Sequence, residues 1–188
     1  MNILLVNDDG YNSEGITLIK ELLKKYGTVY MCAPKYHQSG KSAAFTYLSG
    51  LKVEKVDEFN YIVDGTPVDC VAFATNVIPV KFDVVISGCN NGLNMTYDCY
   101  YSGTIGACKE ALLHNIPSIA FSTQVKHFEI VKNEFDKAMR YIIDNSLLSS
   151  DYLLNVNFPD KPFMFAKGIK LTTQHIRKDK FFHEYKNG

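Results

Sequence analysis

Short aliphatic runs alternate with longer amphipathic stretches along this chain. The first run, residues 3–6, ends at a polar turn and is typical of a strand buried on both faces. In residues 14–26 apolar side chains recur at helical spacing and Gly27 follows as a C-cap, which predicts a helix. A second strand is predicted over residues 28–33, where Pro34 closes it. The chain therefore opens with a predicted β-α-β unit.

The same alternation continues through the rest of the chain. Residues 51–56 alternate in polarity and residues 61–63 are rich in strand-forming side chains, which predicts a small antiparallel excursion. Thr66 and Pro67 then predict the start of a helix that runs to about Asn76. Further strands are predicted over residues 82–86, 116–121, 153–156 and 169–172, further helices over residues 104–113 and 128–143, and a long loop over residues 87–102.

Strands that alternate with helices in this way predict an α/β fold of the Rossmann-like type. Its sheet is expected to be mostly parallel, covered by helices on both faces and joined by right-handed crossovers. Ligands bind such sheets at the carboxyl ends of the strands. The loops that follow the predicted strands are therefore the places where a functional site is expected.

The composition limits the possible binding partners of the protein and its cellular compartment. The 188 residues carry 20 Lys plus Arg against 20 Asp plus Glu, so the chain lacks the basic field that duplex nucleic acid requires. No run of 18 apolar residues and no signal-peptide pattern is present, and none of the five cysteines forms a CxxC pair. We therefore expect a single domain over residues 1–188 in a reducing cytoplasm, with neither nucleic acid nor a membrane as partner. The cysteines are expected to be small core residues, and only Cys89 and Cys99, in the long loop, are candidates for exposure.

Asp8 and Asp9 come directly after the first predicted strand. Two carboxylates about 4 Å apart repel by about 1 kcal/mol in water and about 4 kcal/mol at the effective dielectric of a partly buried site. A hard divalent cation would turn this repulsion into binding, because Mg²⁺ and Mn²⁺ prefer oxygen ligands. The pair is therefore either a surface turn or, if it lies in a crevice, part of a metal site.

Two further loops carry groups suited to contacting a metal or a phosphate. Residues 35–42 follow the second strand with hydroxyls, an amide and cationic side chains, and although they contain Gly-Lys-Ser, the glycine that a P-loop needs five residues earlier is Lys35. Residues 87–106 combine three asparagines with glycines and lead into a helix that opens at Ser102, where exposed N–H groups would favour a phosphate. No GxGxxG follows the first strand, so a dinucleotide enzyme is disfavoured.

Five motifs stand in order over residues 1–123. They are Asn7-Asp8-Asp9-Gly10, Ala33-Pro34 with Ser39-Gly40, the run from Asp64 to Cys70, Ser87-Gly88-x-Asn90-x-Gly92-x-Asn94, and Tyr101-Ser102-Gly103-Thr104. Together they resemble the SurE family (survival protein E), metal-dependent 5'/3'-nucleotidases. The resemblance implies hydrolysis of nucleoside 5'- and 3'-monophosphates, and for some members of short polyphosphate.

The resemblance also implies roles for individual residues. One divalent cation, Mg²⁺ or Mn²⁺, would be held by Asp8, Asp9, Ser39 and Asn90, and phosphate would be bound by Asn94, Ser102, Gly103 and Thr104. Asp8 and Asp9 would be catalytic, one of them acting as general base or nucleophile. Family members usually continue past 188 residues with an arm that builds a homodimer or homotetramer, so we expect this arm to be absent or truncated here.

Two other functions remain open at the level of the residues. A non-catalytic nucleotide sensor would use the same metal and phosphate contacts. A phosphatase of a non-nucleotide ester would too, because no motif reads a base directly, although Tyr97, Tyr100 and Tyr101 could stack on one.

Overall fold

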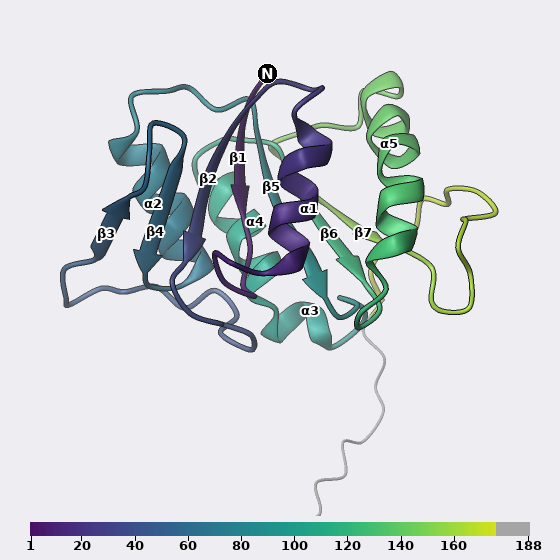
Figure 1. Cartoon of the computed structure of the whole chain (residues 1–188), viewed down its shortest axis with the longest axis horizontal. Coiled ribbons are helices and arrows are strands. Elements are labelled where there is room, and N and C mark those ends of the chain that lie inside the picture. Colours follow the sequence, from purple (N-terminus) through teal and green to yellow (C-terminus); the bar gives the residue numbers. More distant parts are fainter. Residues whose placement is uncertain (176–188) are drawn as a thin grey trace, which may run out of the picture.

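The aliphatic runs of the sequence become the strands of one sheet in the computed structural model, which describes residues 1–175 (Figure 1). The strands are β1 (Asn2–Val6), β2 (Thr28–Pro34), β3 (Lys52–Lys55), β4 (Asn60–Asp64), β5 (Val84–Asn91), β6 (Ser118–Thr123) and β7 (Leu153–Asn157). The helices are α1 (Glu14–Leu23), α2 (Pro67–Val77), α3 (Asp98–Tyr101), α4 (Gly103–Leu113) and α5 (Phe128–Asp144).

The sheet is mostly parallel. Its strand order is β3-β4-β2-β1-β5-β6-β7, and every neighbouring pair is parallel except β3 and β4. The predicted α/β fold with a small antiparallel excursion is therefore confirmed. Because β1 lies at the centre, between β2 and β5, the loops that follow these three strands leave the sheet side by side.

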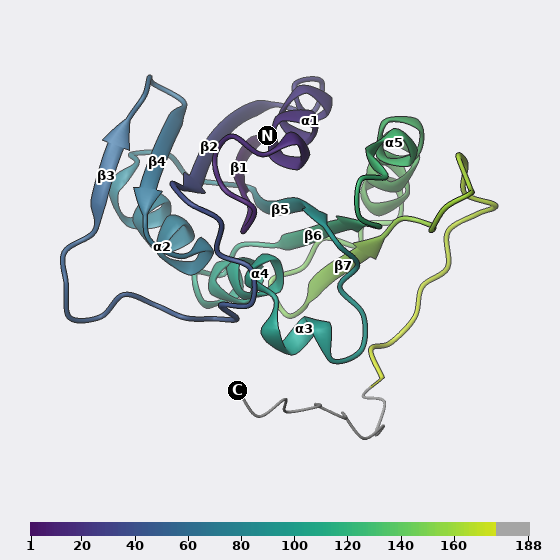
Figure 2. The same ribbon diagram turned by 60° about the horizontal axis from the view of Figure 1, so that its bottom comes forward.

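Helices cover both faces of the sheet. In Figures 1 and 2, α1 and α5 lie over one face and α2 and α4 over the other. Alternate residues of β1 divide between the two cores: Ile3 and Leu5 pack on the side of α1 and α5, and Leu4 and Val6 on the other side. All four side chains are fully buried, and burying each contributes about 1.5–3 kcal/mol. This packing makes the carboxyl end of β1 a rigid platform.

Side-chain caps start the two helices on the second face. Thr66 and Pro67 begin α2 as predicted from the sequence, and the structure shows that Thr66 forms a capping box with Asp69. Ser102 caps α4 by accepting a hydrogen bond from the Ile105 N–H at 3.1 Å. The N-termini of both helices are thereby set at the same edge as the strand ends.

Four sequence predictions differ from the structure. The first helix ends at Leu23 rather than Tyr26. The strand predicted over residues 82–86 begins at Val84 and continues to Asn91, because pairing with β6 outweighs the loop-like composition of this stretch. The predicted loop also contains the short helix α3.

The fourth difference is at the C-terminal side, where no strand forms over residues 169–172. Ile169 and Leu171 are exposed, and within the described residues β7 is the last strand of the sheet. An alternating pattern does not make a strand unless a neighbour pairs with its backbone. The expectation that the C-terminal arm is absent or truncated falls outside residues 1–175, which the structure describes, and stays a prediction.

All five cysteines are buried with free thiols, so their interpretation as core residues is confirmed and the alternative exposure of Cys89 and Cys99 is wrong. Burial raises the pKa of each of four of these thiols, Cys70, Cys89, Cys99 and Cys108, and thus keeps them unreactive. Among residues 1–175, no helix is long and apolar enough to cross a membrane.

Candidate active site

The polar residues predicted to act together converge at the carboxyl edge of the sheet. Asp8 and Asp9 leave β1 at this edge, between the loops that follow β2 and β5. Asp8 is only 2% exposed, and the side chain of Asp9 is 11% exposed. The pair is therefore largely buried rather than part of an exposed surface turn.

Asp8 is held by the first turn of α4. Its Oδ1 accepts a hydrogen bond from the buried Thr104 hydroxyl at 2.7 Å, and the Thr104 N–H also donates to the carboxylate. Gly103 allows this approach, because a Cβ at that position would lie 2.9 Å from Asp8 Cβ and 3.1 Å from Pro67 Cγ. The helix N-terminus can reach the carboxylate only while residue 103 has no side chain.

Burial raises the pKa of Asp8 above its usual value. The neighbouring charge of Asp9 raises it further, and the hydrogen bonds from Thr104 partly offset both effects. Within residues 1–175, neither aspartate pairs with a lysine or arginine. The negative charge of the pair is thus left without a strong cationic partner.

Asp9 is positioned by the other two loops. Its Oδ2 accepts a hydrogen bond from the backbone N–H of Asn91 at 3.0 Å, and the ring of His37 approaches Oδ1 at 3.5 Å. His37 is largely exposed, so its interaction with Asp9 is weak. These contacts place the loops after β2 and β5 on either side of the aspartates.

The predicted Ser39 lies in an exposed turn beside the pair. The N–H of its neighbour Gln38 donates to the backbone carbonyl of Asp8 at 2.7 Å, and Lys41 N–H closes the turn onto Gln38. Asn90, near the end of β5, is half-buried, and its side-chain amide donates to the Gly92 carbonyl at 2.7 Å. Ser39, in the loop after β2, and Asn90, near the end of β5, thus lie on the two segments that flank Asp8 and Asp9.

Asn94 is buried in a network of amides. Its backbone N–H donates to Asn157 Oδ1 at 2.9 Å, its side-chain amide donates to Ser122 Oγ at 2.8 Å, and its carbonyl accepts from Asn155 Nδ2 at 2.8 Å. The network ties the loop after β5 to the ends of β6 and β7. Asn94 is therefore held in one orientation at the edge of the site.

Several residues of this arrangement were missed from the sequence. The contacts of Gln38 and Asn91 with the aspartates go through backbone amides, which no residue pattern reveals. Asn155 and Asn157 carried a usable signal, since two asparagines alternate at the end of a predicted strand. The bond from Thr104 to Asp8 joins residues 96 positions apart and had no signal in the sequence.

The donor set fits a hard divalent cation. Within residues 1–175, the two carboxylates have no lysine or arginine partner, and they leave the same sheet edge as Ser39 and Asn90, whose hydroxyl and amide oxygens are ligands that Mg²⁺ and Mn²⁺ prefer. Two buried oxygens near Asp8, Asn7 Oδ1 and Ser87 Oγ, have no hydrogen-bond partner. No group of three or more His, Cys, Asp or Glu gathers anywhere in residues 1–175, so serine and asparagine oxygens would have to complete the shell.

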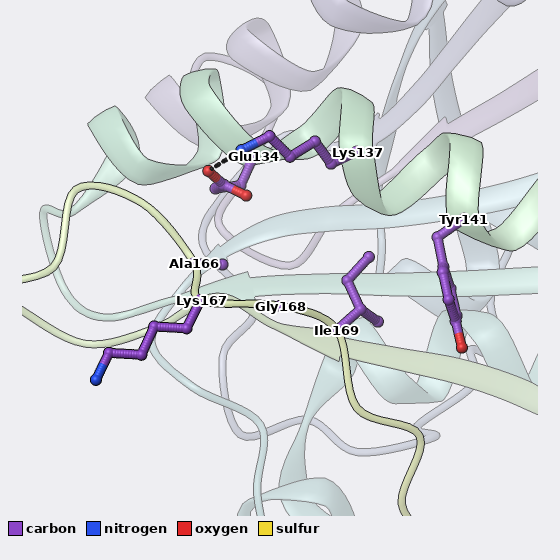
Figure 3. Close-up of a pocket in the computed structure, with 7 residues that line it drawn as sticks. All are labelled: Glu134, Lys137, Tyr141, Ala166, Lys167, Gly168 and Ile169. Carbon is purple, nitrogen blue, oxygen red and sulfur yellow. Dashed lines mark hydrogen bonds and ion pairs between the residues drawn. The ribbon is translucent and has the colours of Figure 1, made fainter.

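A separate cavity of about 350 Å³ lies away from this edge, between α5 and residues 166–169 (Figure 3). Two of its three charged lining residues, Glu134 and Lys137, pair with each other at 2.8 Å, and the third is Lys167. The loops with the candidate catalytic residues and this cavity are therefore in different places, and we place the candidate active site at the aspartates.

Comparison with known proteins decides the family. The model of the family described as "Survival protein SurE" matches residues 3–180. This chain belongs to the SurE family. The crystal structure of the SurE protein from Aquifex aeolicus superposes with a TM-score of 0.82 at 41% sequence identity, covering 94% of this chain and 73% of that one.

Curated SurE proteins are similar over most of the chain. The "5'-nucleotidase SurE" of Leptospira biflexa is 40% identical over 85% of this chain and 66% of its own length. The "5'/3'-nucleotidase SurE" of Wigglesworthia glossinidia brevipalpis is 39% identical over 92% of this chain and 70% of its own length. The chain therefore spans about two thirds of the length of these SurE relatives.

Proposed function

We propose that this protein is a metal-dependent phosphomonoesterase that hydrolyses nucleoside 5'- and 3'-monophosphates to nucleoside and phosphate. The observation that carries the proposal is the buried Asp8–Asp9 pair beneath the N-terminus of α4. The names of the curated SurE relatives support the nucleotide substrate. We propose the same activity for one domain over residues 1–188, acting in the cytoplasm; a homodimer or homotetramer built by the family's C-terminal arm stays a prediction.

Asp8, Asp9, Ser39 and Asn90 would hold one divalent cation, Mg²⁺ or Mn²⁺, in line with the general metal dependence of the family. When bound, the metal supplies charge neutralisation for phosphoryl oxygens and acidifies a water molecule. The protein's own contribution is to hold two negative charges that are largely shielded from bulk water. Thr104 and Gly103 keep Asp8 in place for this role.

The phosphate group would bind at the first turn of α4. The Ser102 hydroxyl accepts from Ile105 N–H and keeps its own proton free to donate, and Gly103 presents a backbone N–H at the positive end of the helix. Thr104 spends both its hydroxyl and its amide on Asp8, so it acts on phosphate through the carboxylate rather than directly. Asn94, fixed by its amide network, would bound the phosphate on the side of β6.

Proton transfer falls to the aspartates. One of the two carboxylates would act as general base toward the attacking water or as nucleophile. Asp8 is held by Thr104 and Asp9 by the Asn91 N–H, so both carboxylates are fixed in place for this role.

The test is phosphate release from a panel of nucleoside 5'- and 3'-monophosphates, sugar phosphates and short polyphosphate, with Mg²⁺ or Mn²⁺ and with EDTA. We expect nucleotide hydrolysis that EDTA abolishes. Nucleotide binding without phosphate release would make the protein a sensor, and turnover restricted to sugar phosphates would make it a phosphatase of another class. Either result would overturn the proposal.

A further inference from the structure

Asp69, the third residue of α2, is buried and lies in a motif that the proposed chemistry does not use. Its first role is local, because its Oδ2 accepts the Thr66 N–H at 2.8 Å and completes the capping box of the helix. A capping box requires only this one bond from the acidic residue. The carboxylate, however, makes more bonds than the cap needs.

The additional bonds go to Thr46, 23 residues earlier in the chain. Thr46 N–H donates to Asp69 Oδ1 at 2.8 Å, and the Thr46 hydroxyl donates to Oδ2 at 2.7 Å. The Thr66 hydroxyl adds a further tie to the same segment by donating to the Ala44 carbonyl at 2.6 Å. The Asp69 carboxylate therefore accepts two hydrogen bonds from Thr46 and two from the helix cap, from the Thr66 N–H at 2.8 Å and the Thr66 hydroxyl at 3.0 Å.

The segment belongs to the β2–β3 loop, residues 35–51, which also carries Ser39. Figure 2 shows this loop passing the end of α4 before it runs out to β3. Near its start the loop is tied to the candidate site, because Gln38 N–H donates to the Asp8 carbonyl. At Ser42 it is tied to α3, through the carbonyls of Tyr101 at 2.9 Å and Tyr100 at 2.6 Å.

These ties differ in how well they are shielded from water. The side-chain bonds of Ser42 to Tyr100 and of Thr66 to Ala44 are exposed, so water competes with them. The bonds between Thr46 and the Asp69 carboxylate are partly buried and charge-assisted, which makes them the stronger kind. Gly65 permits this arrangement, because a Cβ there would lie 2.7 Å from Asp69 Oδ2.

We propose that Asp69 is a positioning residue for the candidate active site, which acts through Thr46 to hold the β2–β3 loop, and with it Ser39, beside Asp8 and Asp9. Asp69 acts without contacting Asp8 or Asp9, because it restricts the loop at Thr46. The inference rests on the proposed function because it takes Ser39 as a metal ligand. The hydrogen bonds between Thr46 and Asp69 that hold the loop do not depend on that function.

The experiment removes one donor and leaves the helix cap intact. Thr46→Val deletes the hydroxyl at nearly constant volume, Thr46→Ser restores a hydroxyl, and Thr75→Val is the matched control. The Thr75 hydroxyl bonds within α2, to the Val71 carbonyl at 2.9 Å, and lies 3.4 Å from His114 Nε2. Hydrogen exchange of the peptide covering residues 36–46 is measured on the full-length protein without metal, and Mn²⁺ affinity is measured by calorimetric titration.

For Thr46→Val we expect roughly tenfold faster exchange in this peptide, the factor that corresponds to losing one charge-assisted hydrogen bond. We also expect about fivefold weaker Mn²⁺ binding, since the loop must be reordered on binding. Thr46→Ser should recover wild-type values, and Thr75→Val should match the wild type in both measurements.

Unchanged exchange in Thr46→Val would overturn the inference, and so would faster exchange with unchanged Mn²⁺ affinity. A different measurement tests the proposed function: it fails if the wild-type protein releases no phosphate from nucleotides. Because exchange is measured without metal or substrate, it still decides in that case whether Asp69 and Thr46 hold the loop.

Discussion

Asp8 shows how a single residue is prepared for chemistry at a cost in stability. Its carboxylate is almost fully buried beside a second carboxylate, and burial raises its pKa. Hydrogen bonds from Thr104 recover part of this cost, since a bond to a charged group contributes about 1.5–3 kcal/mol. A carboxylate that lowers the stability of the fold and lacks a strong cationic partner within residues 1–175 suits a site that binds a cation.

The substitution Asp8→Asn tests this role. Asparagine keeps an oxygen that can accept the Thr104 hydroxyl, but it removes the negative charge. We expect kcat for nucleotide hydrolysis to fall at least about 100-fold, because loss of a metal ligand exceeds the 10–100-fold effect of outer partners. Steady-state phosphate release measures the effect.

The folded state should survive this change. Removing a buried charge relieves desolvation and repulsion from Asp9, so the melting temperature of metal-free Asp8→Asn should equal or exceed that of the wild type. Full phosphate release by the variant at saturating Mg²⁺ would remove Asp8 from the mechanism.

At the scale of elements, α4 can pack closely against the end of β1 because Gly103 has no side chain. A Cβ at Gly103 would press on both Asp8 and Pro67 of α2, so the helix could not keep its distance from the strand end. The contact joins three elements at one point. Geometry of this kind depends on how helices pack on the sheet, and residue spacing does not reveal it.

Gly103→Ala should therefore impair activity more than stability. Overpacking of this kind costs about 1–3 kcal/mol, partly offset by the roughly 1 kcal/mol that alanine gains over glycine in a helix. We expect at least about a tenfold loss in kcat/KM with a melting temperature within a few degrees of wild type. The control is Gly50→Ala, where a Cβ would meet nothing within 4 Å. Equal activity of the two variants would contradict this account of α4.

A second junction joins the turn after α1, with Lys25 and Tyr26, to α5, and it predicts a pH dependence of stability. Asp136 of α5 accepts a hydrogen bond from the Tyr26 hydroxyl, and Lys25 and Arg140 lie 2.5 Å and 3.2 Å from its carboxylate. The hydrogen bonds from Lys25 and Tyr26 hold the pKa of Asp136 below its usual value of 3.8. Its stabilisation is therefore present above that value and is lost as the pH falls through the lowered pKa of the folded state.

Asp136→Asn should lower the melting temperature by roughly 2–4 °C at pH 7, the effect of losing about 1 kcal/mol in a protein of this size. The difference from wild type should shrink as the pH falls below about 3.8. Asp144→Asn, at the exposed end of the same helix, changes the net charge equally and should have little effect. Thermal melts over a pH series measure both variants, and a difference independent of pH would contradict the assignment to the ionised carboxylate.

At the scale of the whole molecule, the strand order brings the site together. β1 lies between β2 and β5, so Asp8 and Asp9, the loop with Ser39 and the end of β5 with Asn90 leave the sheet at neighbouring positions. A cation bound there would link three loops that are otherwise joined by backbone hydrogen bonds. Binding to the folded protein alone would then stabilise the entire fold.

Metal addition and removal should accordingly change global stability. At a concentration about 100 times the dissociation constant, Mn²⁺ adds about 2.7 kcal/mol, which raises the melting temperature by roughly 5–10 °C in a domain of this size. EDTA should reverse the shift, and Asp8→Asn should show none. Equal shifts in the wild type and Asp8→Asn, followed by differential scanning fluorimetry, would place the metal elsewhere.

The sequence by itself determined the succession of strands and helices and the polar loops at the ends of β1, β2 and β5. Periodicity, caps such as Thr66 and turn residues are local, so they act on the chain before it folds. The motifs around Asp8, Ser39, Asn90 and Ser102 also indicated the family. The local pattern gave a wrong prediction for residues 169–172 and for the end of β5. There, the absence or presence of a pairing strand determined the structure.

Only the tertiary structure decided how the site is held. The bonds from Thr104 to Asp8, from Asn91 to Asp9 and from Thr46 to Asp69 join residues 23 to 96 positions apart. Such contacts exist because the sheet order and the helix packing bring distant segments together, and two of them run partly or wholly through backbone amides that every residue carries. The chemical groups of the site are therefore visible in the sequence, while their mutual support arises from the fold.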